Sequence, residues 1–297
     1  MGDEKRIEQN ISRTAEFTCL IRASSFCEKT VQYKSFDYVA LKMLSTFFIP
    51  VLRFSVLRNI FKNRFFPPGM YEYVIARTKF IDSVFENAIG DGFDQILIFG
   101  AGFDSRGIRF AKASNNTKIF ELDAPVTQEA KINQLKKRGV EINPNTIFIS
   151  IDFNKDSIEN KLIESGFCKN KKSLFILESL TMYLDTGAID NTFEVINRFA
   201  GDGSEVVFDY VYSSVLREEN LYYGESEVYK GVKKENEPWC FGIEKGELQS
   251  FIKDKNLELI EILTSKDLEQ EFFKNDEGII VGKVNGTHCI SHARKEP

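Results

Sequence analysis

The chain has 297 residues, of which 42% are hydrophobic and 28% charged, and its formal net charge is −5 at pH 7. This composition is typical of a globular protein with a sizeable core, and the acidic balance argues against a general nucleic-acid-binding protein. The five cysteines are widely spaced without a C-x-x-C pair, so no disulfide framework or zinc site is predicted. A reducing, cytoplasmic setting is expected, and the charged amino-terminal stretch lacks the apolar core of a signal peptide.

The first 90 residues show helical periodicity, and we expect residues 1–90 to form an N-terminal helical lid. Helices are expected at 11–29 and 71–89, on either side of a Pro-Pro-Gly break. The apolar stretch "LKMLSTFFIPVLRFSVL" (41–57) is too short and too charged to span a bilayer, so no transmembrane segment is predicted. It can be a buried lid over a ligand pocket or a segment lying on a membrane surface, and both alternatives stay open.

Residues 91–297 alternate short apolar runs with helical stretches, which predicts an α/β domain with a mostly parallel sheet and helices on both faces. Seven strands are expected, in the segments 94–100, 117–123, 145–152, 173–180, 205–211, 257–263 and 277–284. Gly139, Gly166 and Gly201 stand where helices should end. We interpret the polar and aromatic segment 212–242 as an insertion on the substrate side, and we expect the tail 287–297 to fray.

Each of the second to fifth expected strands carries a carboxylate at or near its end: Asp123, Asp152, Glu178 and Asp209. Ligands of open α/β sheets bind outside the carboxyl ends of the strands, so these side chains are expected at a ligand-binding edge. Asp123 lies 21 residues beyond Gly102, the spacing at which such a carboxylate accepts both ribose hydroxyls. Capping of the helix that follows is the alternative for Asp123.

The loop "FGAGFDSRG" (99–107) follows the first strand but has Ser105 where a dinucleotide loop has its third glycine. Asp104 stands at the expected start of the next helix, where it would repel a phosphate. A two-glycine loop with a ribose carboxylate and no phosphate site favours a nucleoside ligand without phosphates. S-adenosylmethionine is such a ligand, and its sulfonium is cationic.

Six motifs in order give the chain a specific resemblance that covers most of its length. They are "TAEFTCLIRAS" (14–24), "YVIARTKFID" (73–82), "FGAGFDSRGIRF" (99–110), "FELDAPVTQEAK" (120–131), "SIDF" (150–153) and "LESLTMYLD" (177–185). In this set the chain resembles the leucine carboxyl methyltransferase family and its bacterial relatives. These are class I S-adenosylmethionine-dependent O-methyltransferases with a Rossmann-like fold.

The resemblance implies that S-adenosyl-L-methionine is the cofactor, S-adenosyl-L-homocysteine the product, and no metal is needed. It implies roles for eight cofactor-binding residues: Arg77, assisted by Arg22, at the methionyl carboxylate; Gly100 and Gly102 under the cofactor; Asp123 at the ribose; Asp152 and Phe153 at the adenine; and Glu178 near the methionyl amine. Tyr183 would face the transferred methyl group or the substrate, and a buried tyrosine at a helix start is the alternative. The chain departs from the family at Ser179, where relatives commonly have glycine, and a slightly narrower pocket is expected.

The only histidines, His288 and His292, both lie in the tail, so no histidine is expected in the core to act as a base at neutral pH. This limits which methyl acceptors the protein could use. A carboxylate is already ionised at neutral pH, so a carboxylate or acidic hydroxyl of a small metabolite is the expected acceptor, with a protein C-terminus as another. Two other hypotheses stay open. One is a catalytically inactive cofactor-binding regulator, and the other is a nicotinamide-dependent oxidoreductase, which the loop disfavours. The sequence makes no prediction of oligomeric state.

Overall fold

The computed structural model describes residues 11–114, 116–152, 156–234 and 238–295, so Phe153 lies outside the described residues. The helices and strands follow one another along the chain as follows: α1 Arg13–Phe26, α2 Ala40–Met43, α3 Phe48–Arg53, α4 Ser55–Phe65, α5 Met70–Gly90, β1 Gln95–Phe99, α6 Arg106–Arg109, β2 Lys118–Asp123, α7 Pro125–Lys137, β3 Thr146–Ser150, α8 Ile158–Glu164, β4 Ser173–Leu177, the 3₁₀ helix η2 Thr181–Tyr183, α9 Thr186–Phe199, β5 Glu205–Val211, α10 Ser213–Leu216, α11 Glu225–Lys234, α12 Leu248–Asp254, β6 Leu257–Leu263, α13 Ser265–Phe272 and β7 His288–Lys295.

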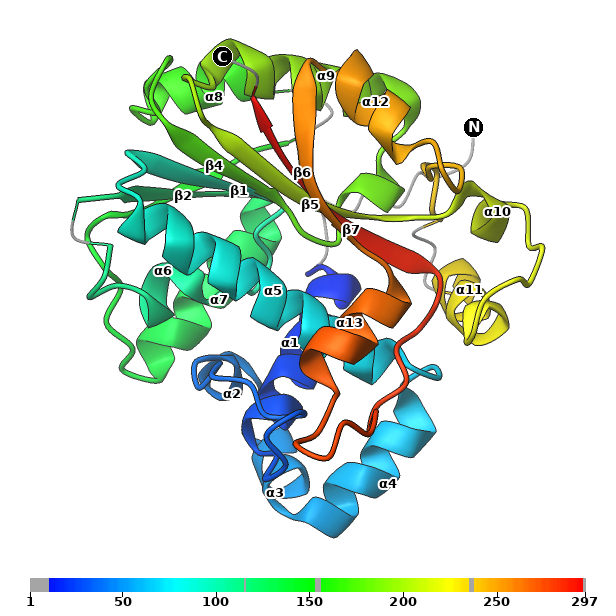
Figure 1. Cartoon of the computed structure of the whole chain (residues 1–297). Coiled ribbons are helices and arrows are strands. Elements are labelled where there is room, and N and C mark those ends of the chain that lie inside the picture. Colours follow the sequence, from blue (N-terminus) through cyan, green and yellow to red (C-terminus); the bar gives the residue numbers. More distant parts are fainter. Residues whose placement is uncertain (1–10, 115, 153–155, 235–237, 296–297) are drawn as a thin grey trace, which may run out of the picture.

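The strands form one seven-stranded sheet in the order β3-β2-β1-β4-β5-β7-β6. Strands β1 to β5 are parallel, whereas β7 runs antiparallel to both β5 and β6. Helices lie on both faces of the sheet, with α8, α9 and α12 on one side and α5 and α13 on the other (Figure 1). The expected mostly parallel seven-stranded α/β sheet is therefore confirmed. The chain order reverses between β1 and β4, which creates a switch point at their carboxyl ends.

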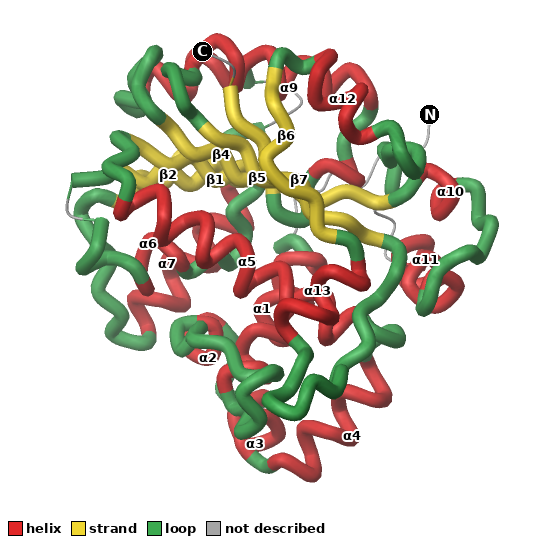
Figure 2. Tube along the Cα trace, viewed as in Figure 1, coloured by secondary structure: helices red, strands yellow, loops and turns green. Residues whose placement is uncertain are grey.

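The last strand was predicted in the wrong place. The segment 277–284 forms no strand, and the tail that was expected to fray is β7, in the interior of the sheet (Figure 2). Cys289, Ile290 and Ala293 are fully buried because β7 has a hydrogen-bonded neighbour on each side. The short apolar run with glycines at 277–284 resembled a strand more than the polar-looking "HCISHARK" did.

The three glycines expected at helix ends do not share one role. Gly139 and Gly166 follow α7 and α8 with φ of +62° and +78°, the left-handed conformation that ends helices. Gly201 follows α9 without a positive φ. A Cβ there would lie 2.6 Å from the carbonyl oxygen of Asn170, so a close backbone approach, and not a left-handed cap, requires this glycine.

The N-terminal helices form a second small core beside the main one. Its buried members are Cys19, Ala23, Val39, Ala40, Met43, Leu44, Leu52, Phe103, Ile108 and Leu135. Helices α1 to α3 thus pack on the glycine loop and on α7. Only part of the apolar stretch 41–57 is buried, since Phe47, Phe54 and Val56 are 77%, 64% and 69% exposed. The segment is therefore only partly buried, and no helix of the described residues is long and apolar enough to cross a membrane.

Candidate functional site

Charged side chains gather at the carboxyl ends of β1, β4 and β5, beside the switch point. Leu177 pairs with Phe208 in the sheet, so Glu178 and Asp209 lie next to each other just beyond that pair. Helix α5 brings Arg77 to them, and Arg77 is only 2% exposed. Of the four carboxylates expected at one edge of the sheet, these two share Arg77.

Arg77 is held by three partners. Its Nε donates to Glu178 at 3.0 Å, and its Nη1 donates to the Ser179 hydroxyl and to Asp209, each at 2.6 Å. Asp209 also accepts from the Tyr73 hydroxyl at 2.9 Å and from the backbone N–H of Ser179 at 2.6 Å. Within the described residues, Nη2 of Arg77 donates to no protein group. The guanidinium is therefore fixed in place with one pair of N–H donors still available to a ligand.

A second buried arginine, Arg106 of α6, was not anticipated as a site residue. It donates to Glu178 at 2.8 Å, to Asp82 of α5 at 2.8 Å and to Asp104. Burial raises the pKa of Asp104, but the positive charges of Arg106, Lys131 and Arg22 together outweigh it and lower that pKa to about 2. The negative charge of Asp104 is thus already paired, so the argument that Asp104 by itself repels phosphate is wrong.

These contacts belong to one continuous ion-pair network of nine side chains. Arg109 extends it by pairing with Asp82 and Asp37, and Asp37 pairs with Arg22. The network contains four arginines and five carboxylates: Arg22, Arg77, Arg106 and Arg109 with Asp37, Asp82, Asp104, Glu178 and Asp209. One negative charge is left over. Burial favours the neutral form of Glu178, but Arg106 and Arg77 lower its pKa overall, so this carboxylate stays ionised.

Asp123 holds the glycine loop. Its carboxylate accepts hydrogen bonds from the backbone N–H groups of Gly102 and, at 2.6 Å, Ala124. No side-chain cap of helix α7 is present, so the capping alternative for Asp123 is not observed. Gly100 and Gly102 have φ of +58° and +49°, which other residues adopt with strain. Each carboxylate oxygen keeps a further lone pair that can accept from a ligand hydroxyl.

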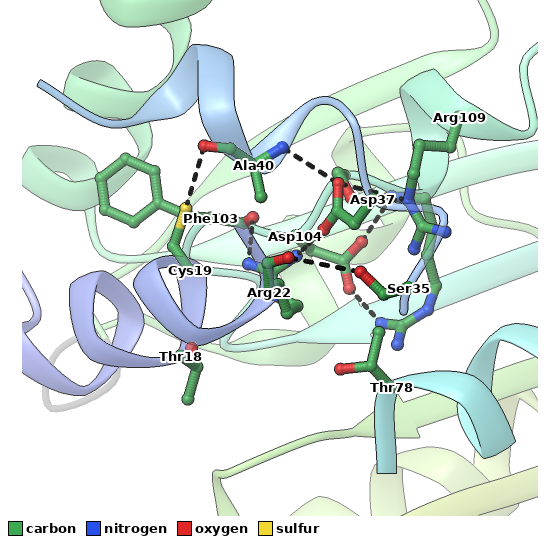
Figure 3. A network of polar contacts seen from close by, with 12 residues as sticks. Thr18, Cys19, Arg22, Ser35, Asp37, Ala40, Thr78, Phe103, Asp104 and Arg109 are labelled. Carbon is green, nitrogen blue, oxygen red and sulfur yellow. Dashed lines mark hydrogen bonds and ion pairs between the residues drawn. The ribbon is translucent and has the colours of Figure 1, made fainter. Parts of the chain in front are cut away.

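Arg22 has a different role from the one expected. It lies in α1, and its Nη2 donates to the carbonyl oxygen of Phe103 at 2.7 Å while Nη1 pairs with Asp37 at 2.7 Å (Figure 3). Both terminal nitrogens of this buried guanidinium are thus used by protein groups. Arg22 fastens α1 to the glycine loop, and this leaves Arg77 as the better placed of the two arginines for a ligand carboxylate.

The remaining expected residues are spread along the same edge. Asp152 lies two residues beyond β3, and its backbone N–H donates to Asp156 at 2.9 Å. Tyr183 lies in η2, half-buried, with its hydroxyl 3.1 Å from the Thr14 hydroxyl of α1. The start of α1 therefore spans from the glycine loop to the end of β4. A Cβ on Gly102 would meet that of Ala15 at 2.8 Å, which shows how closely α1 covers the loop.

Ser179, at the position where the resemblance leads us to expect glycine, has a strained backbone. Its φ is +55°, in the left-handed region that a residue with a Cβ adopts at a cost. The hydroxyl compensates by accepting from Arg77, and the backbone N–H is fixed by Asp209. The substitution therefore adds a partner to Arg77, a consequence that the motif alone did not reveal.

His288 is the functional candidate that sequence reasoning placed wrongly. As the first residue of β7 it lies opposite Val211 at the ligand edge, only 3% exposed. Its ring centroid lies 4.5 Å from that of Tyr73 and 5.2 Å from that of Trp239. Burial, reinforced by Arg77, lowers the pKa of His288 to about 3, so the ring is neutral at pH 7. The other histidine, His292, pairs with Glu205 at the far end of β5.

Among the described residues, no cluster of His, Cys, Asp and Glu could hold a metal ion. The chemistry of the edge is instead that of a site for a charged organic ligand. A guanidinium, a carboxylate beside it and a glycine loop braced by a second carboxylate lie around the switch point.

The chain is similar to known proteins in sequence and in fold. The sequence profile described as leucine carboxyl methyltransferase matches residues 42–197, just over half of the chain. YktD of Bacillus subtilis, provisionally named an S-adenosyl-L-methionine-dependent methyltransferase, is 28% identical over 68% of this chain and 66% of its own length. A protein of Mycobacteroides abscessus with the same provisional name is 35% identical over 46% of this chain and 44% of its own. The chain thus spans less than two thirds of these relatives.

Two solved structures share the fold at low identity. One is described as a methyltransferase, provisionally, from Thermobifida fusca; it covers 96% of this chain and 98% of its own with a TM-score of 0.59 and 13% identity. A DUF574 family protein from Streptomyces avermitilis covers 98% and 100% with a TM-score of 0.59 and 11% identity. These likenesses confirm the Rossmann-like α/β fold of the class I methyltransferases. On the matching profile, the chain belongs to the leucine carboxyl methyltransferase family.

Proposed function

We propose that the protein is an S-adenosyl-L-methionine-dependent O-methyltransferase that acts on a carboxylate or acidic hydroxyl of a small metabolite. The charge of the buried network supports this proposal most directly. Its five carboxylates and four arginines leave one negative charge beside the switch point. S-adenosylmethionine carries a sulfonium, an ammonium and a carboxylate, and so one net positive charge. A phosphate-bearing cofactor would meet the wrong sign at this edge.

Particular residues fit particular parts of that cofactor. The unused Nη2 of Arg77 can donate to the methionyl carboxylate, and the ionised Glu178 can accept from the methionyl ammonium. Asp123 retains lone pairs for the ribose hydroxyls, and Asp152, at the end of β3, is assigned to the adenine amino group. Gly100 and Gly102 allow the left-handed turn of the loop, on whose backbone the cofactor is proposed to rest. When bound, the cofactor supplies an electrophilic methyl group on sulfur.

The acceptor site is assigned to the space between this edge and the insertion 212–242. Trp239 belongs to the insertion, and its buried Nε1–H has no hydrogen-bond partner among the described residues. A buried unpaired donor costs stability, and an acceptor oxygen of a substrate would satisfy it. The insertion also pairs with η2, since the N–H of Cys240 donates to the carbonyl oxygen of Met182 at 2.7 Å. Tyr183 is thereby joined to the insertion and is assigned a role beside the reacting oxygen.

The neutral state of His288 favours an acceptor that arrives ionised. Thr287 donates its hydroxyl proton to Asn285, so Nδ1 of His288 donates to Thr287 and Nε2 is the unprotonated nitrogen. A pKa of about 3 makes that nitrogen a weak base. A carboxylate needs no deprotonation, so the protein's contribution is to align the acceptor oxygen with the methyl carbon and sulfur and to exclude water.

We propose further that residues 1–90 act as a lid and 91–297 as the cofactor-binding domain. The second small core joins α1 and α2 to Phe103 and Ile108 of the glycine loop region. Arg22 ties α1 to the same loop. Loosening of α1 would uncover the loop on which the cofactor rests.

Methyl transfer from labelled cofactor to candidate carboxylic acids and phenols tests the proposed reaction. Label that enters an acid and is released as methanol by mild base identifies a carboxyl ester, whereas base-stable label identifies an ether. Cofactor binding without transfer to any acceptor in the panel would favour the inactive regulator. A Trp239→Phe variant keeps the ring and removes the Nε1 donor, so it should raise KM for the acceptor and leave cofactor affinity unchanged.

A further inference from the structure

Helix α4 turns apolar side chains toward solvent, whereas an ordinary surface helix turns its apolar side toward the core. Val56, Leu57 and Ile60 lie on one side of it, at spacings of one, three and four residues, and are 69%, 45% and 61% exposed. The opposite side carries Arg58, which is 3% exposed. Apolar side chains thus face solvent, and a charged side chain faces the protein.

Strong contacts fix the helix in this orientation. Arg58 donates to both carboxylate oxygens of Glu28, at 3.0 and 2.8 Å, and to the carbonyl oxygen of Leu52 at 2.8 Å. Lys62 pairs with Glu72 at 2.6 Å and lies over the ring of Tyr71 at 4.4 Å. Turning the apolar side inward would break a buried bidentate ion pair. The exposure is therefore built into the fold.

Neighbouring aromatic side chains enlarge the exposed surface. Phe47 stands at the start of α3, Phe54 between α3 and α4, and Phe65 at the end of α4, with exposures of 77%, 64% and 63%. We call these six side chains the α3–α4 patch: Phe47, Phe54, Val56, Leu57, Ile60 and Phe65. Helices α3 and α4 form the end of the molecule farthest from the sheet, so the patch lies on a protruding part of the chain (Figure 1).

The chain segment that carries the patch is basic. Although Glu28 and Glu72 pair with its Arg58 and Lys62, its Arg53 and Arg64 form no salt bridge within the described residues. Residues 38–71 contain five lysines and arginines and not one acidic residue, although the whole chain has a net charge of −5. Arg53 and Arg64 are exposed on the same two helices as the patch. An apolar surface flanked by cations, with phenylalanines among its exposed side chains, has the chemistry of an interfacial lipid-binding element.

We propose that the α3–α4 patch docks the protein on the surface of an anionic phospholipid bilayer, with the patch side chains in the headgroup–acyl boundary and Arg53 and Arg64 on lipid phosphates. The exposed Arg53 and Arg64 favour this occupant over a second copy of the chain, because two copies meeting at this surface would bring these like charges together. The proposal concerns a face distinct from the methyl-transfer site and does not depend on the proposed reaction.

Co-sedimentation with vesicles tests this proposal. Full-length protein should bind vesicles of phosphatidylcholine mixed with phosphatidylglycerol, bind vesicles of phosphatidylcholine alone more weakly, and lose affinity as salt rises. A Val56→Ser/Ile60→Ser variant should bind about tenfold more weakly, because two large apolar side chains no longer enter the bilayer. An Arg53→Gln/Arg64→Gln variant should bind anionic vesicles about tenfold more weakly and show a flatter salt dependence.

An Ile163→Ser/Leu221→Ser variant is the matched control. These residues are 52% and 63% exposed and lie outside the patch, so vesicle binding should be unchanged. Unaltered thermal melting of the patch variants would show that they fold. Failure of the wild type to bind anionic vesicles would overturn the proposal. Binding of these vesicles by the serine and glutamine double variants as tightly as by the wild type would also overturn it. A dimer in vesicle-free solution that both patch variants abolish would also overturn it, by making the patch an interface between copies.

Discussion

Replacement of Ser179 by glycine and by alanine separates two effects that coincide at the end of β4. The residue has a φ of +55° and its hydroxyl accepts from Nη1 of Arg77 at 2.6 Å. Both substitutions remove the hydroxyl. Only glycine also relieves the left-handed backbone, so the difference between the two variants reports the backbone strain less the extra unfolded-state entropy of glycine.

The expected magnitudes follow from the contacts. Loss of a hydrogen bond to a charged partner costs about 1.5 kcal/mol, the low end of the range, because Arg77 keeps Glu178 and Asp209. A non-glycine residue in the left-handed region costs about 1–2 kcal/mol, and glycine gives back about 0.5–1 kcal/mol through the entropy of the unfolded chain. Ser179→Gly should therefore be about 1 kcal/mol more stable than Ser179→Ala, with the wild type above the alanine variant.

Urea unfolding of the three proteins measures these differences, and thermal melting should separate the two variants by about 2 °C. Affinity for S-adenosylhomocysteine should fall by a similar small factor in both variants, because both remove the same partner of Arg77. An alanine variant as stable as the glycine variant would refute the strain at this position. An alanine variant as stable as the wild type would refute the value assigned to the Arg77 hydrogen bond.

Three further predictions address the loop, the ribose carboxylate and the buried histidine. Asp123→Ala should weaken binding of S-adenosylhomocysteine by about 100-fold, because the ribose contacts are lost and the glycine loop is loosened. Asp123→Asn should weaken binding by less. If calorimetry gives both variants the affinity of the wild type, the assignment of Asp123 to the ribose is wrong. Gly102→Ala should destabilise the folded protein by about 2–3 kcal/mol in urea unfolding, because the new Cβ would lie 2.8 Å from that of Ala15 and the backbone has a φ of +49°. Gly231→Ala is the control: this glycine lies in a helix with open space around it, so its replacement should leave the stability unchanged or raise it. Because the pKa of His288 is lowered to about 3 by burial, the unfolded chain takes up a proton below about pH 6.5 while the folded chain does not, so stability falls as pH falls; wild type should lose about 2 kcal/mol more than His288→Gln between pH 7.5 and 5.

The first six strands could be predicted from the sequence because each is a short apolar run bounded by helical or turn residues, which local patterns reveal. The seventh could not. "HCISHARK" is buried only because two strands flank it, and those partners are non-local. The same limit applied to His288, which was assigned to the tail and lies in the core beside Tyr73.

The sequence predicts which residues of the candidate site stand at the strand ends. It does not predict which of these residues pair with one another. Arg77 reaches a carboxylate 132 positions away in the chain, and no periodicity encodes such a contact. Arg106 was not predicted as a site residue, because its burial among three carboxylates gives no local signal in the sequence. Arg22 was grouped with Arg77 by motif, whereas its hydrogen bonds belong to the packing of α1 on the glycine loop.

Isothermal titration of the wild-type protein with S-adenosylhomocysteine and, separately, with NAD tests the central claim most directly. The site was assigned to a nucleoside cofactor with a charged amino-acid tail and no phosphate. We expect saturable binding heat with S-adenosylhomocysteine and no binding heat with NAD. No binding of S-adenosylhomocysteine, or binding of NAD in its place, would contradict it.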